Sequence, residues 1–146
     1  MLKDGEFFSS REFACHDGTP FPENWEMQWN ALRDLCDAIR RLWGGPLIVV
    51  SGYRTPEHNA KLLADDAAEG VHGVASGSQH IIGNAADLRT TRGAIDVPQL
   101  LRVILNAQQD GKLPELGGVG DYPQSGWVHC DTFKAPDGHL RRWHGT

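Results

Sequence analysis

Apolar side chains recur along this chain at two different spacings, and the longer spacing predicts helices. From residue 24 to residue 43 they return every three or four positions, and Gly44 and Gly45 follow as a stop. The recurring residues are Leu32, Leu35, Cys36, Ile39, Leu42 and Trp43. A second helix is expected to begin at Pro56, which suits a first helical turn, and a third is expected over residues 97–111.

The shorter spacing predicts strands. The run PLIVVSGY, residues 46–53, is nearly all apolar and rich in β-branched residues, so we expect a buried strand there. Another strand is expected at about residues 85–90. GGVGDYP at 117–123 and WVHCDTF at 127–133 are two short strand candidates. The turn-like PQSG separates these last two, so they are expected to form a hairpin.

Helices and strands are mixed here without a regular alternation. That order favours an α+β fold, with a small, largely antiparallel sheet and helices packed on one side of it. The first residues, FFSSREFACHDG at 7–18, are expected to form an irregular segment that packs Phe7, Phe8 and Phe13 against the rest of the chain. With 146 residues and no Pro/Ser/Gly linker, the chain is expected to be a single domain, residues 1–146.

Composition and charge narrow the possible partners. A formal net charge of -5, with scattered basic residues, argues against nucleic acid or an anionic membrane as a partner held by charge. No apolar run approaches the ~18 residues of a membrane span, and MLKDGEFFSS does not resemble a secretory signal. We therefore expect no membrane insertion and a cytoplasmic location on synthesis. Three cysteines without a CxxC pair predict neither a disulfide framework nor a cysteine-only zinc site, and Cys36 is expected in the core.

The histidines divide into two groups. Five are expected to have no catalytic role, because they lie in polar segments or loops: His16, His58, His72, His139 and His144. The other two, His80 and His129, stand in a different context. In the strand 127–133, alternation places Trp127, His129 and Asp131 on one face.

His80 lies just before the strand that presents Asp87, and Gly83 between them permits a tight bend. Ala85 shares a face with Asp87 and leaves room beside it. His80, Asp87 and His129 offer nitrogen and oxygen donors that suit zinc, and catalytic zinc sites use three protein ligands with one open position. This spacing also occurs by chance in many proteins, so by itself it leaves open a loop that merely contains a histidine and an aspartate.

Several ordered motifs add a resemblance. The string SxHxxGxAxD, present as Ser78, His80, Gly83, Ala85 and Asp87, resembles the signature of the zinc D-Ala-D-Ala carboxypeptidase family. That family belongs with lysostaphin-type enzymes and the hedgehog domain to the LAS clan of metallopeptidases. SGYR at 51–54 is similar to another family motif. GVGDYP, VHCD and a closing Arg142-Trp143 are similar to motifs of the murein endopeptidase K branch and of related phage endolysins. The resemblance covers about residues 7–143.

The resemblance implies a zinc-dependent peptidase that hydrolyses an amide bond in the peptide part of bacterial peptidoglycan. His80, Asp87 and His129 would bind Zn2+, which would activate a water and polarise the scissile carbonyl. Arg54 would bind a substrate carboxylate or carbonyl and stabilise the oxyanion. Ser78 and Tyr122 would contact the substrate, a peptidoglycan stem peptide.

The general base has no clear match. Many family members carry an acid three positions before the last histidine ligand, and that position here is Gly126. Asp131 is the first candidate for the base, because it shares a strand face with His129. Alternatively, Asp131 accepts a hydrogen bond that holds a ligand histidine in one tautomer. Asp121 is the second candidate.

Several questions stay open at this stage. The enzyme could be an endopeptidase or a carboxypeptidase, and the murein endopeptidase motifs favour the former. Such a peptidase could be a phage or prophage endolysin. In that case a monomer would be released from the cytoplasm to act on the periplasmic or external cell wall. The alternative from another class is a non-catalytic zinc-bearing binding or structural module of the same fold. A plain α+β domain whose motif matches are accidental is the third.

Overall fold

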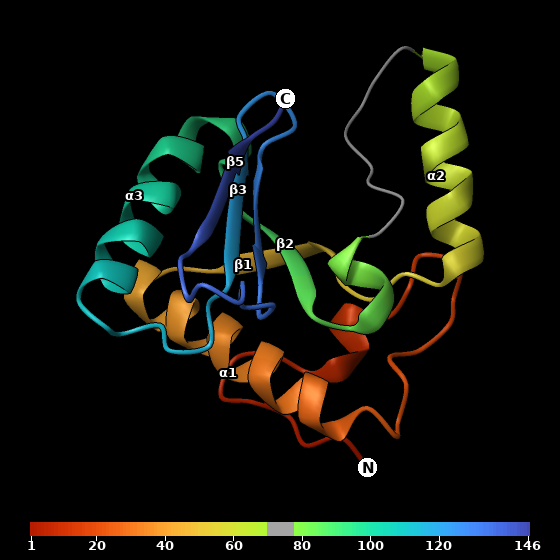
Figure 1. The fold of residues 1–146 in the computed structure, drawn as a ribbon, viewed down its shortest axis with the longest axis horizontal. Coiled ribbons are helices and arrows are strands. Elements are labelled where there is room, and N and C mark those ends of the chain that lie inside the picture. Colours follow the sequence, from red (N-terminus) through yellow and green to blue (C-terminus); the bar gives the residue numbers. More distant parts are fainter. Residues whose placement is uncertain (70–77) are drawn as a thin grey trace.

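The computed structural model describes residues 1–69 and 78–146, in which helices and strands alternate irregularly (Figure 1). The α-helices are α1 (Glu26–Trp43), α2 (Pro56–Glu69) and α3 (Val97–Gln109), and the strands are β1 (Leu47–Ser51), β2 (Ala85–Thr90), β3 (Gly118–Tyr122), β4 (Trp127–Asp131) and β5 (Arg141–His144). Short 3-10 helices are η1 (Ser10–Phe13), η2 (Gln79–Ile82) and η3 (Gly93–Asp96). His72, expected to have no catalytic role, lies outside the described residues.

The five described strands form one sheet in the order β1-β2-β4-β3-β5. Neighbouring strands pair antiparallel, except for β3 and β5, which are parallel. The hairpin expected from the turn-like PQSG is present, since β3 pairs directly with β4 across it. The α+β fold with a largely antiparallel sheet is therefore confirmed, and β5 is an additional strand that the hydrophobic pattern did not predict.

Helix α1 follows the expected pattern closely. Its inward side chains, Trp29, Leu32, Leu35, Cys36 and Ile39, are all buried. Gly44 ends the helix in the left-handed conformation, with φ of 79°, and its N–H bonds to the carbonyl of Arg40. Leu42 is an exception to the pattern, because it is 37% exposed.

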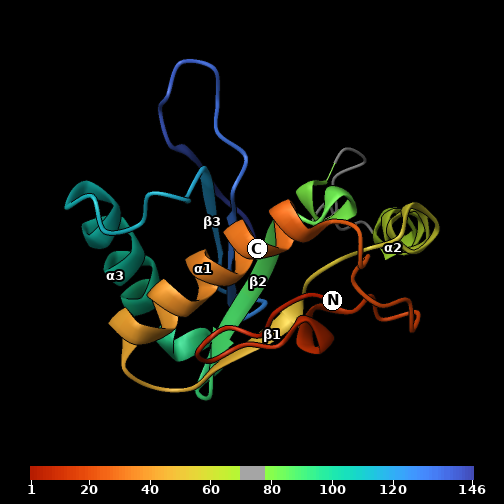
Figure 2. The same ribbon diagram turned by 90° about the horizontal axis from the view of Figure 1, so that it is seen from below.

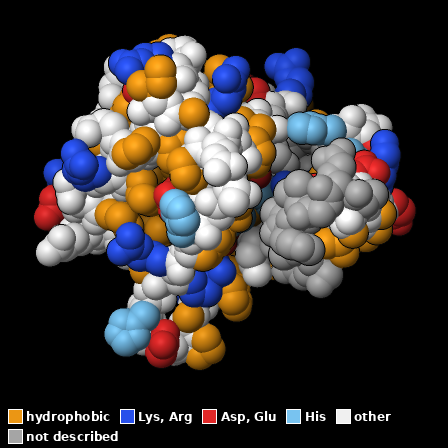
Figure 3. Space-filling model, turned by 90° about the horizontal axis from the view of Figure 1, so that it is seen from above, with side chains coloured by type: hydrophobic (Ala, Val, Ile, Leu, Met, Phe, Trp, Pro, Cys, Tyr) orange, Lys and Arg blue, Asp and Glu red, His pale blue; other side chains and the backbone are white. Residues whose placement is uncertain are grey.

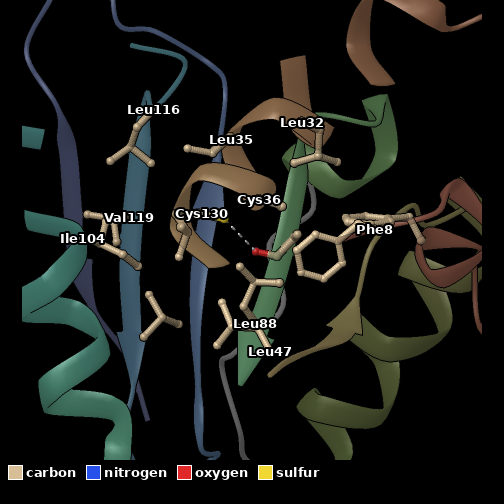
Figure 4. Close-up of a cluster of buried hydrophobic side chains, with 14 of the residues drawn as sticks. Phe8, Leu32, Leu35, Cys36, Leu47, Leu88, Ile104, Leu116, Val119 and Cys130 are labelled. Atoms are coloured by element: carbon tan, nitrogen blue, oxygen red, sulfur yellow. Dashed lines mark hydrogen bonds between the residues drawn. The ribbon is translucent and has the colours of Figure 1, made fainter. Parts of the chain in front are cut away.

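The core lies between one face of the sheet and the helices α1 and α3, which also contact each other. Figure 4 shows this layer, with Leu88 from β2, Val119 from β3 and Cys130 from β4 directed toward Leu35 and Cys36 of α1 and Ile104 of α3. Cys36 is fully buried, as expected. Because strand side chains alternate between faces, the intervening residues of the same strands lie on the opposite face, where the site described below is found.

Helix α2 departs from the expectation that the helices pack on one side. α1 and α3 cover the same face, whereas α2 stands apart from both, beyond β2 and η2 (Figures 1 and 2). Its apolar spacing is weak, and Leu63 is exposed. α2 thus forms a separate wall of the molecule and contributes to the site.

Two sequence expectations of burial were wrong in part. Strand β1 is not fully buried, since Ile48 is 39% exposed and Val49 and Val50 are half-buried. The reason is that β1 is the edge strand of the sheet. In the N-terminal segment Phe8 and Phe13 are buried as expected, but Phe7 lies at the surface with the guanidinium of Arg40 4.5 Å from its ring centre.

The surface is mixed in character. On the face shown in Figure 3, Lys and Arg side chains are distributed among hydrophobic and neutral ones. No helix in the described ranges is both long enough and apolar enough to cross a bilayer.

Candidate functional site

Three buried side chains from three elements converge on the sheet face opposite α1 and α3. His80 comes from η2, Asp87 from β2 and His129 from β4, and their exposed fractions are 2%, 4% and 8%. One nitrogen or oxygen atom from each lies within 4.8 Å of the other two. The residues singled out from the spacing are therefore brought together.

Local structure explains why they meet. In the β2–β4 ladder Asp87 is directly opposite His129, so alternation directs both side chains to the same face. Gly83 ends η2 with φ of 73°, which returns His80 to the start of β2. A β-carbon at Gly83 would lie 2.9 Å from the rings of Phe21 and Trp25, so glycine is needed there for close packing as well as for the bend.

Each histidine has an outer hydrogen-bond partner that leaves one nitrogen for the centre of the site. His80 Nδ1 donates to the carbonyl of Gly52 at 2.6 Å, and its Nε2 lies 3.3 Å from Asp87 Oδ2. His129 Nε2 lies 2.9 Å from Asp131 Oδ2, and its Nδ1 lies 3.1 Å from Asp87 Oδ1. Such outer partners fix the tautomer and ring orientation of metal-binding histidines.

The three donors fit a divalent metal of the zinc type. Two imidazoles and one carboxylate match its preferred ligands, and three protein ligands leave a position for water or substrate. The guanidinium of Arg54 also lies beside Asp87, and at 3.5 Å it stands farther from that carboxylate than either histidine.

Without a metal, Asp87 and His129 are both ionised. Burial opposes ionisation of Asp87, but contacts with His80 and His129 outweigh it and hold the pKa of Asp87 well below its usual range. Burial also opposes the charge on His129, yet hydrogen bonds to Asp131 and Asp87 raise the pKa of His129 to about 9. Burial lowers the pKa of His80, which Asp87 only partly offsets, so His80 is the neutral histidine.

Asp131 lies behind His129 as seen from Asp87, and it is fully buried. Its Oδ2 contacts His129, while its Oδ1 accepts from the N–H of Phe133 at 3.1 Å and from the Nη2 of Arg141. Both carboxylate oxygens are thus engaged. This arrangement matches the alternative in which Asp131 orients a ligand histidine.

Arg54 is held against the same centre. Its Nε donates to Ser51 Oγ at 3.2 Å and its Nη1 to Asn59 Oδ1 at 3.3 Å, while its Nη2 lies 3.5 Å from Asp87. Burial lowers the pKa of Arg54, and Asp87 counteracts this, so the guanidinium remains charged. A fixed cation beside a metal centre can stabilise negative charge that develops on a substrate oxygen.

A cavity of about 450 Å³ opens onto these groups. Ser78 and Tyr122, the expected substrate contacts, both line it. Ser78 also has a structural role, because its Oγ accepts from the N–H of His80 at 3.2 Å. Tyr122 Oη accepts from Trp143 Nε1 at 2.8 Å, which leaves the Tyr122 proton free to be donated. Burial raises the pKa of Tyr122, so the phenol stays protonated.

The other two positions considered for the base lie elsewhere. Gly126 sits in the β3–β4 turn with φ of 94°, and a β-carbon there would approach the backbone of Gly93 and Ala94, at 3.2 Å from the Ala94 nitrogen. An acid at this position would be strained and would point toward η3. Asp121 is paired with His144 at 2.8 Å and is absent from the described lining of the cavity.

Some residues of the site were missed from the sequence. Asp66 on α2 and His16 line the cavity, and the ring of Trp143 lies 5.0 Å from that of His129. His16 was expected to be incidental. Nothing in the local pattern marks Asp66, since its place beside the cavity depends on how α2 docks. The sequence marked Trp143 through the closing Arg142-Trp143 motif alone, and only once β5 is known does alternation along the strand place Arg141 and Trp143 on the site face.

Comparisons with a family model and with individual proteins identify the same family. The family model described as Peptidoglycan L,D-endopeptidase MepK matches residues 26–143. The Peptidoglycan L,D-endopeptidase MepK of Escherichia coli strain K12 is 32% identical over 114 residues, which is 75% of this chain and 52% of that protein. A Probable peptidoglycan L,D-endopeptidase MepK of Haemophilus influenzae is 33% identical over 97 residues, or 66% of this chain and 42% of its own length. The chain thus spans about half the length of these relatives.

Proposed function

Because this chain belongs to the peptidoglycan L,D-endopeptidase MepK family, we propose that it is a zinc-dependent endopeptidase that cleaves an amide bond in the peptide part of peptidoglycan. The observation that carries the proposal is the convergence of His80, Asp87 and His129 beside Arg54 at the base of a cavity. The expected substrate is a cross-linked stem peptide.

In the proposed mechanism, His80, Asp87 and His129 would hold the zinc, which when bound would supply the Lewis acidity needed to activate a water and polarise the scissile carbonyl. Arg54, fixed by Ser51 and Asn59, donates to the carbonyl oxygen as negative charge develops on it. Tyr122 offers its hydroxyl proton to the same peptide from the cavity wall. The carbonyl of Gly52 holds His80 in one tautomer throughout.

The proposed hydrolysis also needs a group that accepts a proton from the attacking water. Among the described residues that line the cavity, the acidic side chains are Asp66, Asp87 and Asp131. Asp87 is a proposed ligand, and both oxygens of Asp131 are already engaged. We therefore assign Asp131 the orientation of His129, and Asp66 becomes the carboxylate to test against it as the base.

The setting of the reaction follows from the substrate. Peptidoglycan lies outside the cytoplasm, so we propose that the protein acts as a monomer on the periplasmic or external cell wall after release. A phage or prophage endolysin is one such protein. The similarity to proteins named as endopeptidases favours cleavage within the peptide over removal of a terminal D-alanine.

One observation favours a second candidate function. Gly126 stands where many related enzymes carry an acid, and the turn geometry there admits glycine in preference to a side chain. A zinc-bearing module that binds wall peptides without cleaving them would have no need of that acid.

The test uses purified murein sacculi, with cleavage products resolved by chromatography and identified by mass. The zinc-loaded protein is expected to release peptide fragments, and a chelator should abolish this until zinc is restored. His80→Ala should be inactive, whereas His139→Ala, a matched change at an exposed histidine, should retain activity. Undiminished cleavage in chelator would overturn the zinc mechanism. Binding of sacculi without any product at saturating zinc would support the module instead.

A further inference from the structure

A second group of metal-binding side chains lies beside the cavity. Cys15, Asp17 and His58 each offer one ligand atom, and these atoms lie within 4.8 Å of one another. Cys15 is 3% exposed, His58 is half-buried and Asp17 is exposed. We propose that these residues form a second metal site, which takes a divalent transition metal of the zinc class.

The donors come from two segments that are docked by backbone contacts. Cys15 and Asp17 belong to a tight turn, in which the N–H of Gly18 donates to the Cys15 carbonyl at 2.9 Å. His58 lies in the first turn of α2. The turn is fixed to the chain before α2 by a bond of 2.8 Å from the Tyr53 N–H to the Phe13 carbonyl. Gly52 allows this approach, because a β-carbon there would lie 2.6 Å from the Phe13 Cα.

Thr55 connects all three candidate ligands. Its hydroxyl donates to Asp17 Oδ2 at 2.7 Å and accepts from the N–H of His58 at 3.1 Å. Its own N–H donates to Cys15 Sγ at 3.5 Å. Thr55 therefore holds the Asp17 carboxylate and the Cys15 sulfur in place, and fixes the backbone at His58, before any metal arrives, which lowers the ordering cost of binding.

The chemistry of the group suits zinc. A thiolate, an imidazole and a carboxylate are its three common ligand types, and tetrahedral coordination places such donors about 3.3–3.8 Å apart. Contraction by at most about 1.0–1.5 Å from the present spacing of up to 4.8 Å would reach that geometry. The Thr19 N–H and the Thr55 hydroxyl hold the pKa of Asp17 well below its usual range, so its carboxylate is ionised.

This group is separate from the first in sequence and in ligand type. Cys15 and Asp17 precede residue 26, where the match to the family model begins, so two of the three proposed ligands lie outside the matched region and His58 lies within it. It also contains sulfur, which the group of His80, Asp87 and His129 does not. His16 lines the cavity, and its ring centre lies 6.0 Å from that of His58 in α2. A metal bound by Cys15, Asp17 and His58 would therefore fix the position of α2 beside the cavity.

Cobalt(II) distinguishes the two groups, because cobalt bound to a thiolate absorbs in the near ultraviolet and cobalt bound to nitrogen and oxygen alone does not. Titration of the reduced, metal-free protein should produce this thiolate absorption. Cys15→Ser should abolish it. His80→Ala should leave it intact, so the result does not depend on the proposed peptidase site.

A second variant and a control complete the test. His58→Ala retains the thiol and should raise the cobalt concentration needed for half-saturation of the absorption by about tenfold or more. His139→Ala, at an exposed histidine, should leave the titration unchanged. Thiolate absorption that is absent from the wild-type protein, or that persists in Cys15→Ser, would overturn the proposal.

Discussion

His129 makes a polar contact through each of its ring nitrogens, to Asp87 on one side and to Asp131 on the other. In the metal-free protein these two carboxylates stabilise the imidazolium and raise the pKa of His129 to about 9. A metal needs the neutral ring, so it must displace a proton from this residue. His80, whose pKa is lowered by burial, needs no such displacement.

The affinity of the site for zinc should therefore depend on pH. Below the His129 pKa of about 9, the dissociation constant should fall about tenfold for each unit of rising pH, because one proton is released on binding. Above that value it should level off. Competition titrations with a chromophoric chelator at several pH values would measure this in the Cys15→Ser background, which removes the second site. An affinity independent of pH below 8 would contradict the assignment of His129 as a ligand.

Asp131→Asn separates the two roles considered for this residue. If Asp131 orients His129, the substitution should weaken zinc binding by roughly 10- to 100-fold while leaving most of the activity at saturating zinc. If Asp131 is the base, activity should be lost even when the metal site is full. Cleavage rates measured over a range of zinc concentrations decide between these outcomes, with Asp66→Asn as the parallel variant.

At the level of elements, β5 completes the site. It pairs with β3 so that Trp143 is opposite Gly120. The Trp143 ring then lies against His129, and its Nε1 donates to Tyr122. The absence of a side chain at Gly120 gives the indole the space it occupies. A parallel strand of four residues therefore positions one wall of the cavity.

Gly120→Ala should disturb this wall. A β-carbon there would overlap with the indole nitrogen of Trp143, so the ring must move and the bond to Tyr122 should be lost. We expect a loss of about 1–3 kcal/mol in the free energy of unfolding, as for other overpacked positions. Urea unfolding would measure it. Gly45→Ala is the matched control, because a β-carbon there would lie 3.5 Å from Trp43 and should change stability by about 0.5 kcal/mol or less.

Across the whole molecule, one sheet serves two purposes on its two faces. Val128 and Cys130 of β4 are buried in the core against α1 and α3, whereas His129 and Asp131 of the same strand face the cavity. Movement of β4 would affect both layers. Binding of a metal to His80, Asp87 and His129 also connects η2, β2 and β4, so it should stabilise the folded chain as a whole.

Calorimetry should detect this stabilisation. A free metal concentration 1,000 times the dissociation constant contributes about 4.1 kcal/mol, which for a chain of this size corresponds to a rise in Tm of roughly 10 °C. The Cys15→Ser variant isolates this contribution from the second site. In that background, His80→Ala should show little shift on zinc addition. A zinc-independent Tm in Cys15→Ser would argue against metal binding at His80, Asp87 and His129.

The sequence alone predicted the helices, the β3–β4 hairpin and, through the resemblance of its motifs, the residues of the candidate metal site. These depend on local information: the spacing of apolar side chains, the turn-forming residues, and motifs in which short spacings place donors on one face. Asp87 and His129 could be anticipated because alternation along a strand is strict. The same reasoning could not find β5, since RRWH is short and polar and pairs only after the sheet has formed.

The tertiary structure decided burial and convergence. Ile48 is exposed because β1 became an edge strand, and Leu42 and Phe7 lie at the surface for lack of a neighbouring layer. The place of Asp66 by the cavity and the meeting of Cys15 with His58 both depend on contacts between segments that are distant in the chain. Such contacts depend on how the helices and strands dock against one another, and the pattern of residues close together in sequence does not predict that docking.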